Sequence, residues 1–155
     1  MKITSKHTGD TKEAEHILKE ENIGHLGTFG GEYPYVVPLC YVFEQGNIYF
    51  HSGPGGLKMD SIRNNNRVCF QVDQISGIRM SEDPCKYNIN YKSVVAFGQA
   101  EELTGFEEKK RILYLLSSSF AKDKQTGSIK PPNIEQVTVV KISIESMTVK
   151  INLEN

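Results

Sequence analysis

A glycine-rich segment from Ser52 to Lys58 holds the residues best suited to bind a ligand. It joins a predicted strand to a predicted helix, so its backbone N–H groups and the helix N-terminus could face an anion, to which Lys58 adds a full charge. The spacing is not that of a Walker A loop, because Leu57 and Met59 flank the lysine, and Lys58 replaces the last glycine of the dinucleotide fingerprint. The segment indicates either an anion site of another type or a plain strand-to-helix turn with an exposed lysine.

The histidines are scattered along the chain, and none has the spacing of a zinc ligand relative to another histidine or a cysteine. We therefore predict no metal site. His51 ends a predicted strand beside the glycine-rich segment and could line a ligand site, although a half-exposed strand histidine is the commoner case. His25 is expected on the surface of a strand. The four histidines are His7, His16, His25 and His51.

The cysteines have plainer interpretations. Cys85 stands beside Lys86, which would favour a reactive thiolate, but a passive loop cysteine is the simpler alternative. Cys40 and Cys69 fall on predicted strands, where a free cysteine behaves as a small hydrophobic residue. The odd number and wide spacing of the cysteines argue against a disulfide framework and indicate a cytoplasmic protein.

Charge and composition exclude several classes of protein. The 155 residues include 18 basic and 19 acidic side chains, a net charge of −1, which gives no general attraction to nucleic acid or to an anionic membrane. A hydrophobic share of 38% excludes collagen-like, coiled-coil and largely disordered chains. No apolar run reaches the roughly 20 residues of a membrane helix, and no signal peptide is visible. We expect one domain spanning residues 1–155.

Alternating apolar and polar residues predict a protein built mainly of strands. A first helix is expected from Asp10, which stands three residues before Glu13, to about residue 22. A later helix is expected to begin at a capping box of Thr104 and Glu107 and to bury Phe106, Leu113, Leu116 and Phe120. The predicted strands are 23–29, 33–43, 48–52, 68–73, 91–103, 136–144 and 147–153; a short helix spans 58–64, and a mobile loop spans 121–135.

The predicted strand 33–43 is apolar on both faces. It carries Val37, Leu39, Tyr41 and Phe43 on one face and Val36, Cys40 and Val42 on the other. Such a strand must be covered on both sides, by a barrel interior on one and by a helix or partner subunit on the other. Six or seven antiparallel strands with flanking helices favour a small closed barrel, because closure removes the exposed edges of a sheet.

In order along residues 11–120, these segments resemble the FMN-binding split barrels, a superfamily related to pyridoxamine 5′-phosphate oxidase. The similarity is greatest to its 5-nitroimidazole-resistance branch. The segments that carry it are His25-Leu26-Gly27-Thr28-Phe29, Tyr33–Val42, Ile48-Tyr49-Phe50-His51-Ser52, Lys58, Arg67-Val68-Cys69-Phe70 and Tyr91–Gly98. The resemblance implies a mainly β fold, a six- or seven-stranded antiparallel split β-barrel with flanking helices.

The same resemblance implies a homodimer with two FMN sites at the subunit interface. Residues 37–41 would run along the flavin ring and offer backbone groups to its polar edge, His51 and Ser52 would approach the ribityl and phosphate region, and Lys58 would bind the phosphate. Ser93 matches a polar position that reaches the flavin of its own or the other subunit. The implied cofactor-binding residues are thus Val37, Pro38, Leu39, Cys40, Tyr41, His51, Ser52, Lys58 and Ser93.

One difference from the family's oxidases restricts the substrates that the resemblance implies. True pyridoxamine phosphate oxidases carry basic residues at both ends of the strand that matches residues 36–41, whereas this chain has Val36 and Tyr41 there. A second phosphate, on the substrate, would lack its partners. The resemblance therefore implies an FMN-dependent oxidoreductase that reduces a small electron-poor acceptor such as a nitroaromatic compound or a quinone, with the flavin supplying the redox chemistry.

His51 is the candidate for proton delivery in such an enzyme. An alternative of another class is a flavin- or haem-binding protein that stores or senses its cofactor without turnover. A third, an oligonucleotide-binding small barrel, fits the number of strands but is disfavoured by the net charge and by the absence of a basic stripe interleaved with aromatic residues.

Overall fold

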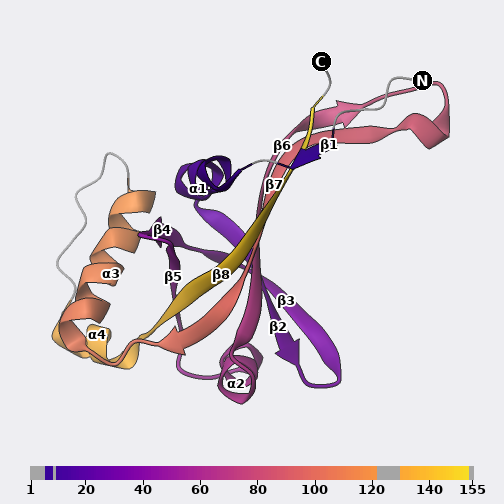
Figure 1. Ribbon diagram of the computed structural model, residues 1–155. Coiled ribbons are helices and arrows are strands. Elements are labelled where there is room, and N and C mark those ends of the chain that lie inside the picture. The colour runs from indigo at the N-terminus through magenta and orange to yellow at the C-terminus, as the bar shows by residue number, and fades with distance from the viewer. Residues whose placement is uncertain (1–5, 9, 122–129, 154–155) are drawn as a thin grey trace.

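The computed structural model describes residues 6–8, 10–121 and 130–153, which form a strongly curved antiparallel sheet with flanking helices (Figure 1). The strands are β1 (Lys6–Thr8), β2 (Ile23–Gly30), β3 (Tyr33–Cys40), β4 (Val42–Glu44), β5 (Asn47–Ser52), β6 (Arg67–Arg79), β7 (Asn88–Glu102) and β8 (Thr138–Asn152). The helices are α1 (Thr11–Glu20), α2 (Leu57–Asn64), α3 (Phe106–Phe120) and α4 (Pro131–Gln136). These elements confirm the predicted mainly β split-barrel fold.

The strand order explains how the sheet closes. It runs β3-β2-β6-β7-β8-β5-β4, with the short β1 paired to β8. The two ends of this order, β3 and β4, are consecutive in the chain and separated by Tyr41 alone. The sheet must therefore curl until its ends meet, although β3 and β4 are joined by the chain and not by a ladder of hydrogen bonds.

Two strand predictions need correction. The predicted strand 33–43 is interrupted at Tyr41, where the chain passes from one end of the sheet to the other. The two predicted strands 136–144 and 147–153 form one strand, β8, because the long partner β7 pairs with it from Val140 to Asn152. The polar pair Glu145 and Ser146 resembles a turn in sequence, but Glu145 is the extra residue of a β-bulge where the register shifts opposite Phe97 and Gly98.

The inner face of the barrel holds the main core. Leu26, Phe50 and Phe70 are fully buried there, and α1 adds Ile17 and Leu18. That helix begins as predicted: the Asp10 side chain accepts a hydrogen bond from the Glu13 N–H at 2.9 Å. Inward-facing side chains of the barrel strands thus share one core with α1 and with Met59 and Ile62 of α2.

A second, smaller core lies on the opposite side of β5, under α3 and α4 (Figure 1). Leu113 and Leu116 are buried as predicted, but Phe106 and Phe120 are 36% and 41% exposed, so their prediction was wrong. The predicted capping box is also wrong, since the N-cap of α3 is Gly105 and no side chain caps the helix. Of the predicted loop 121–135, residues 122–129 lie outside the described part, whereas 131–136 form α4, anchored by the buried Ile134.

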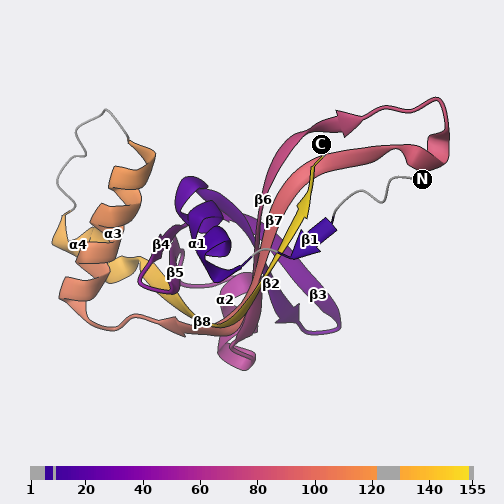
Figure 2. The ribbon, with the colours of Figure 1, turned by 45° about the horizontal axis from the view of Figure 1, so that its top comes forward.

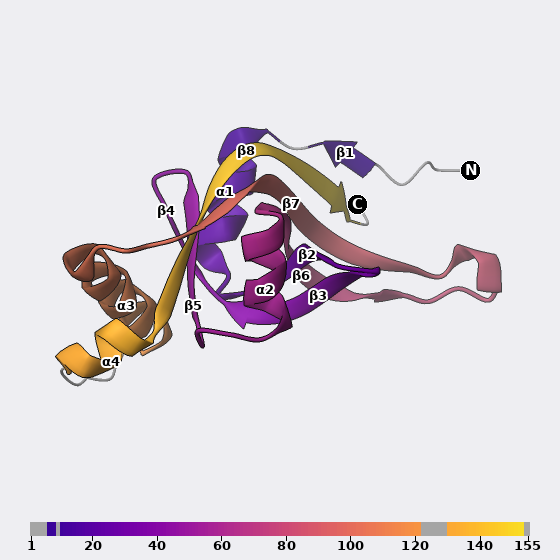
Figure 3. The same cartoon turned by 90° about the horizontal axis from the view of Figure 1, so that it is seen from below.

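Outside the barrel, β6 and β7 continue together as a long arm, which Figures 2 and 3 show extending away from the body. Its apolar side chains are largely exposed, among them Ile78 and Met80. No helix in the described ranges 10–121 and 130–153 is long and apolar enough to cross a membrane.

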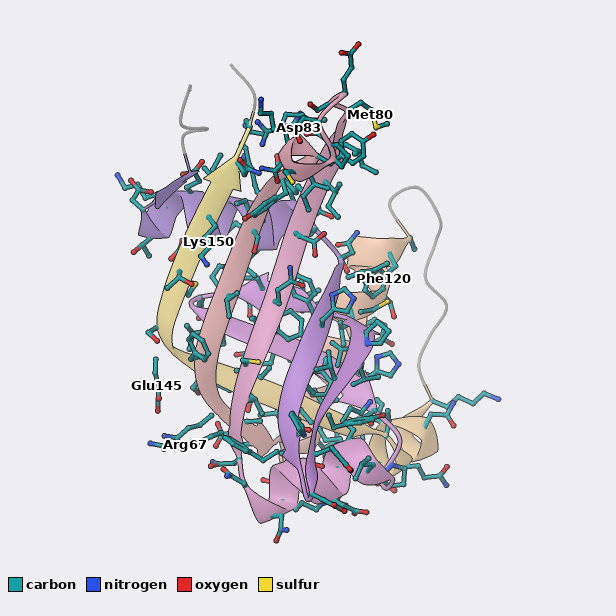
Figure 4. All side chains as sticks on the ribbon, turned by 90° about the vertical axis from the view of Figure 1, so that its right-hand side faces the viewer. Arg67, Met80, Asp83, Phe120, Glu145 and Lys150 are labelled. Atoms are coloured by element: carbon teal, nitrogen blue, oxygen red, sulfur yellow. The ribbon has the colours of Figure 1, made fainter. Side chains whose placement is uncertain are left out.

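The outer face of β2, β3, β6 and β7 carries no covering helix in Figure 4. The inward residues Val37 and Leu39 of β3 pack against the core, whereas the outward Val36 is 63% exposed and Pro38 and Cys40 are exposed as well. In a single chain the barrel core therefore covers the inner face of β3, whereas no described element covers its outer face.

Tyr41 anchors the point where the sheet closes. Its ring is fully buried, packs edge-on against Phe70 at 4.9 Å between centroids, and its hydroxyl donates to the Leu18 carbonyl at 2.9 Å. Burial, with a smaller contribution from the negative charge of Glu21, raises the pKa of Tyr41 well above its usual range. The phenol is therefore a neutral structural donor between the barrel and α1.

Replacing Tyr41 by Phe should lower the free energy of unfolding by about 1–2 kcal/mol, because the hydrogen bond is lost and the buried Leu18 carbonyl loses its side-chain partner. Urea unfolding of the ligand-free protein measures this. Tyr33→Phe is the matched control, since Tyr33 is 73% exposed and its change should stay within about 0.5 kcal/mol. Equal stabilities of the Tyr41→Phe and Tyr33→Phe variants would contradict this role.

Candidate functional site

The glycine-rich segment forms an exposed loop from the end of β5 to the start of α2. Gly56 is the N-cap of α2, with φ of 92°, a left-handed conformation that favours glycine. No side chain of the described residues caps this helix, so the N–H groups at its start are available to another acceptor. Seen from below, α2 lies across one end of the barrel (Figure 3). This end therefore presents a helix N-terminus able to receive an anion.

Lys58 strengthens that site. It lies in the first turn of α2, is half-buried, and holds its Nζ 5.8 Å from the centroid of the buried Phe50 ring. Burial lowers the pKa of this lysine. Within residues 10–121 and 130–153, none of the ion pairs involves Lys58. A desolvated cation without a carboxylate partner is suited to pair with an incoming anion.

Ser52 and His51 are adjacent in β5 but face opposite ways. Ser52 is buried and shares its face with Phe50, the ring that Lys58 covers. His51 is exposed and shares its face with Tyr49, which belongs to the core under α3 and α4. The structure thus brings Ser52 and Lys58 to the same end of the barrel and turns the His51 side chain away from them.

Residues 37–41 form the end strand β3 and the link to β4. The side chains of Val37, Leu39 and Tyr41 pack into the core, and those of Pro38 and Cys40 face outward. In the described part of the chain β3 pairs with β2 only, so its second edge presents backbone groups that no strand partners. Backbone groups are therefore what this stretch can offer a ligand.

Ser93 lies far from these residues in the same chain. It is half-buried on β7, where its partners are Asp73 of β6 and Lys150 of β8. Three strand steps of about 4.8 Å separate β7 from β3, so Ser93 is about 14 Å away. Within one chain, Ser93 is therefore too far from β3 to contact a small ligand bound by Lys58 and β3.

An apolar groove of about 450 Å³ on the outer sheet face was not predicted. Phe29, Val36 and Phe97 line it, and the labelled Arg67 and Glu145 lie beside it in Figure 4. Its depth comes from Gly27, where an added Cβ would stand 2.5 Å from the Cys69 sulfur. The sequence signal was the row of apolar residues on the outward positions of β2 and β3, which a solvated face would not carry.

The positions of the remaining candidates complete the description of the site residues. His25 lies exposed on β2, and the three cysteines are free, with Cys40 and Cys85 exposed and Cys69 half-buried. Among the described residues, no group of three histidine, cysteine or acidic side chains could hold a metal ion.

Comparison with known proteins identifies the family and supports the fold described above. The family model of pyridoxamine 5′-phosphate oxidase matches residues 10–151. A curated relative, the uncharacterized protein RA0666 of Rhizobium meliloti, is 27% identical over 59% of this chain, and the match spans about half (54%) of that relative's length.

Two solved structures share the fold over nearly the whole chain. One, from Bacteroides thetaiotaomicron and provisionally assigned to 5-nitroimidazole antibiotic resistance, is 28% identical with a TM-score of 0.79, covering 95% of this chain and 89% of its own. The other, a FAD-binding protein from Mesorhizobium loti, is 26% identical with a TM-score of 0.69, covering 94% and 96%. With 142 of its residues matched by the family model, from 10 to 151, the chain belongs to the pyridoxamine 5′-phosphate oxidase family.

Proposed function

We propose that this protein binds FMN and reduces a small electron-poor acceptor, such as a nitroaromatic compound or a quinone. The observation that carries the proposal is Lys58 in the first turn of α2, half-buried over the Phe50 ring and without an ion-pair partner among the described residues. The similarity to a FAD-binding protein supports a flavin, and the similarity to a protein assigned to 5-nitroimidazole resistance supports a nitroaromatic acceptor.

The donor set fits a flavin mononucleotide. Lys58, the first-turn N–H groups of α2 and the Ser52 hydroxyl would hold the phosphate, and the backbone edge of residues 37–41 would meet the polar edge of the ring. We favour FMN over a dinucleotide because these groups supply donors for one phosphate. When bound, the flavin supplies the electron transfer, and the protein binds it, orients it and excludes water.

The acceptor is proposed to lack a phosphate. The family's oxidases carry basic residues at both ends of the strand segment that matches residues 36–41. Here the first end is Val36, an exposed apolar side chain, and the last is Tyr41, which is buried and hydrogen-bonded to the Leu18 carbonyl. Neither position offers a cation to a second phosphate.

The absorption spectrum of the purified protein is the first test. Two bands, one in the near ultraviolet and one in the blue, are expected for flavin, whereas a sharp Soret band would support the haem-binding alternative. Reduction by a nicotinamide donor without oxygen, followed by reoxidation with a nitroaromatic compound, then distinguishes an enzyme from a storage protein. Flavin that stays reduced in the presence of nitroaromatic compounds and quinones would overturn the proposed reaction.

A homodimer is part of the proposal. The uncovered apolar face of β2, β3, β6 and β7 needs a partner, and Ser93 lies about 14 Å from β3 in its own chain, so it would reach a flavin only from a second copy. We expect light scattering at micromolar concentration to give about twice the chain mass. A monomer that holds flavin stoichiometrically would contradict this.

Phe97→Glu should convert that dimer to a monomer and weaken flavin binding, because a charge would be buried at the centre of the interface. Phe97 is 46% exposed in the single chain. Phe120→Glu on α3 is the matched control, since Phe120 is 41% exposed but lies on another surface. Dissociation by both variants or by neither would remove the sheet face from the interface.

Lys58→Ala should weaken FMN binding by about 10- to 150-fold, the equivalent of about 1.5–3 kcal/mol for a lost charge-assisted contact. Riboflavin, which has no phosphate, should bind the wild type and the variant almost equally. Lys19→Ala is a close control, because the Lys19 Nζ lies 5.9 Å from the Phe43 ring, a similar contact on another surface. Equal losses for FMN and riboflavin would contradict the phosphate assignment.

FMN affinity should also fall as the pH rises in the alkaline range. Burial lowers the Lys58 pKa in the free protein, and a bound phosphate would raise it, so binding takes up a proton between the two pKa values. The ratio of FMN to riboflavin affinity, measured by fluorescence titration, should therefore decline at a lower pH than expected for an exposed lysine. Lys58→Arg keeps its charge and should abolish the decline; an identical decline in that variant would assign it to another group.

A further inference from the structure

Three polar side chains form a hydrogen-bonded chain on the outer sheet face. His25 of β2 lies 3.1 Å from Gln71 of β6, measured from Nδ1 to Oε1. The Gln71 amide Nε2 donates in turn to the Asp73 carboxylate at 2.7 Å. His25 is exposed, whereas Gln71 and Asp73 are half-buried, so the network has an open end at the imidazole.

The network determines which nitrogen of His25 carries a proton when the ring is neutral. A carboxylate oxygen only accepts, so the NH₂ group of Gln71 must face Asp73. Its carbonyl oxygen then faces His25, and Nδ1 must be the donor to it. The neutral imidazole is therefore held as the Nδ1–H tautomer, and Nε2 is the nitrogen that gains and loses a proton.

His25 stands beside the strand proposed to meet the flavin. It is paired directly with Pro38 across β2 and β3, so the two side chains project from the same face, roughly 5 Å apart at their Cβ atoms. The other titratable or charged groups facing His25 from the neighbouring strands are Cys40 of β3 and Cys69 and Asp73 of β6, and Asp73 is engaged with Gln71.

We propose that His25 delivers the proton to the acceptor through Nε2, with Gln71 and Asp73 as positioning residues. Reduction of a quinone to a hydroquinone consumes two electrons and two protons, as does reduction of a nitro group to a nitroso group with loss of water. A hydride equivalent from the reduced cofactor accounts for both electrons and one proton. The imidazolium supplies the other proton to the acceptor oxygen and relaxes to the Nδ1–H tautomer that Gln71 already holds.

This inference rests on the proposed function and replaces His51 as the proton donor. His51 faces the α3 and α4 side of β5, whereas His25 lies on the open face beside β3. His25 is exposed in the single chain. The proposed dimer must leave its Nε2 accessible to solvent, so that a proton can return after each transfer.

The tautomer is tested on the ligand-free protein, independently of any activity. Long-range ¹H–¹⁵N spectra, recorded well above the ordinary histidine pKa of about 6.5, distinguish a protonated Nδ1 from a protonated Nε2. We expect His25 to carry its proton on Nδ1 in the wild type and to shift towards Nε2 in Gln71→Leu. A wild-type His25 protonated on Nε2 would overturn the assignment.

The proton transfer is tested by mixing the reduced, flavin-loaded protein with a quinone in an oxygen-free stopped-flow experiment. His25→Gln should slow reoxidation by about 10²- to 10⁴-fold, because the acceptor oxygen would lose its positioned proton donor. Gln71→Leu should slow it less. Ferricyanide, which accepts an electron without a proton, should reoxidise the wild type and the His25→Gln variant equally.

Control variants distinguish a wrong proton donor from a wrong proposed function. His16→Gln changes an exposed histidine of α1, 3.1 Å from Glu20, and should leave the rate unchanged. If His51→Gln and not His25→Gln slows the quinone reaction, the proton donor is His51 and the inference is wrong. If the wild type binds flavin but is reoxidised by neither quinones nor nitroaromatic compounds, the proposed function fails and the proton-donor role fails with it.

Discussion

The closure of the sheet through Tyr41 is the constraint on which the rest of the structure depends. The residue lies between β3 and β4, the two ends of the strand order, and its buried hydroxyl ties this junction to α1 through Leu18. Because the ends are joined by the chain and not by a hydrogen-bonded ladder, β3 keeps an unpaired backbone edge inside an otherwise closed barrel. The proposed flavin ring would use that edge, and the helix α2, with Lys58, lies at the end of the barrel where the phosphate would follow.

A second consequence concerns the outer face. The inward side chains of β3 serve the barrel core, so the apolar outward side chains of β2, β3, β6 and β7 remain open in a single chain. The groove at Gly27 and Cys69, the exposed Phe97 and the remote Ser93 all lie on this face. The proposed homodimer would account for these features together, because a second copy would cover the face and complete the flavin site. The His25–Gln71–Asp73 chain would then stand at the boundary between the two copies and the cofactor.

Local signals in the sequence were sufficient for much of this structure. Period-two alternation located the main strands, the Asp10 cap located the start of α1, and the glycine-rich segment ending in Lys58 located the helix N-terminus at the candidate site. Features that depend on a partner far along the chain were not predictable. The bulge at Glu145 exists because β7 pairs with β8 on both sides of this residue, and α4 forms because Ile134 packs into the core under α3. His25 and Gln71 are 46 residues apart, so their contact depends on the strand register.

The central claim is that a flavin lies along β3 with its phosphate at the start of α2. Amide hydrogen exchange, followed with FMN and separately with riboflavin, tests this most directly because it reports on both segments at once. We expect FMN to slow exchange in residues 36–41 and in residues 53–59, and riboflavin to slow it in residues 36–41 alone. Protection of residues 53–59 that is equal for the two ligands, or the absence of protection in residues 36–41 with either, would contradict the claim.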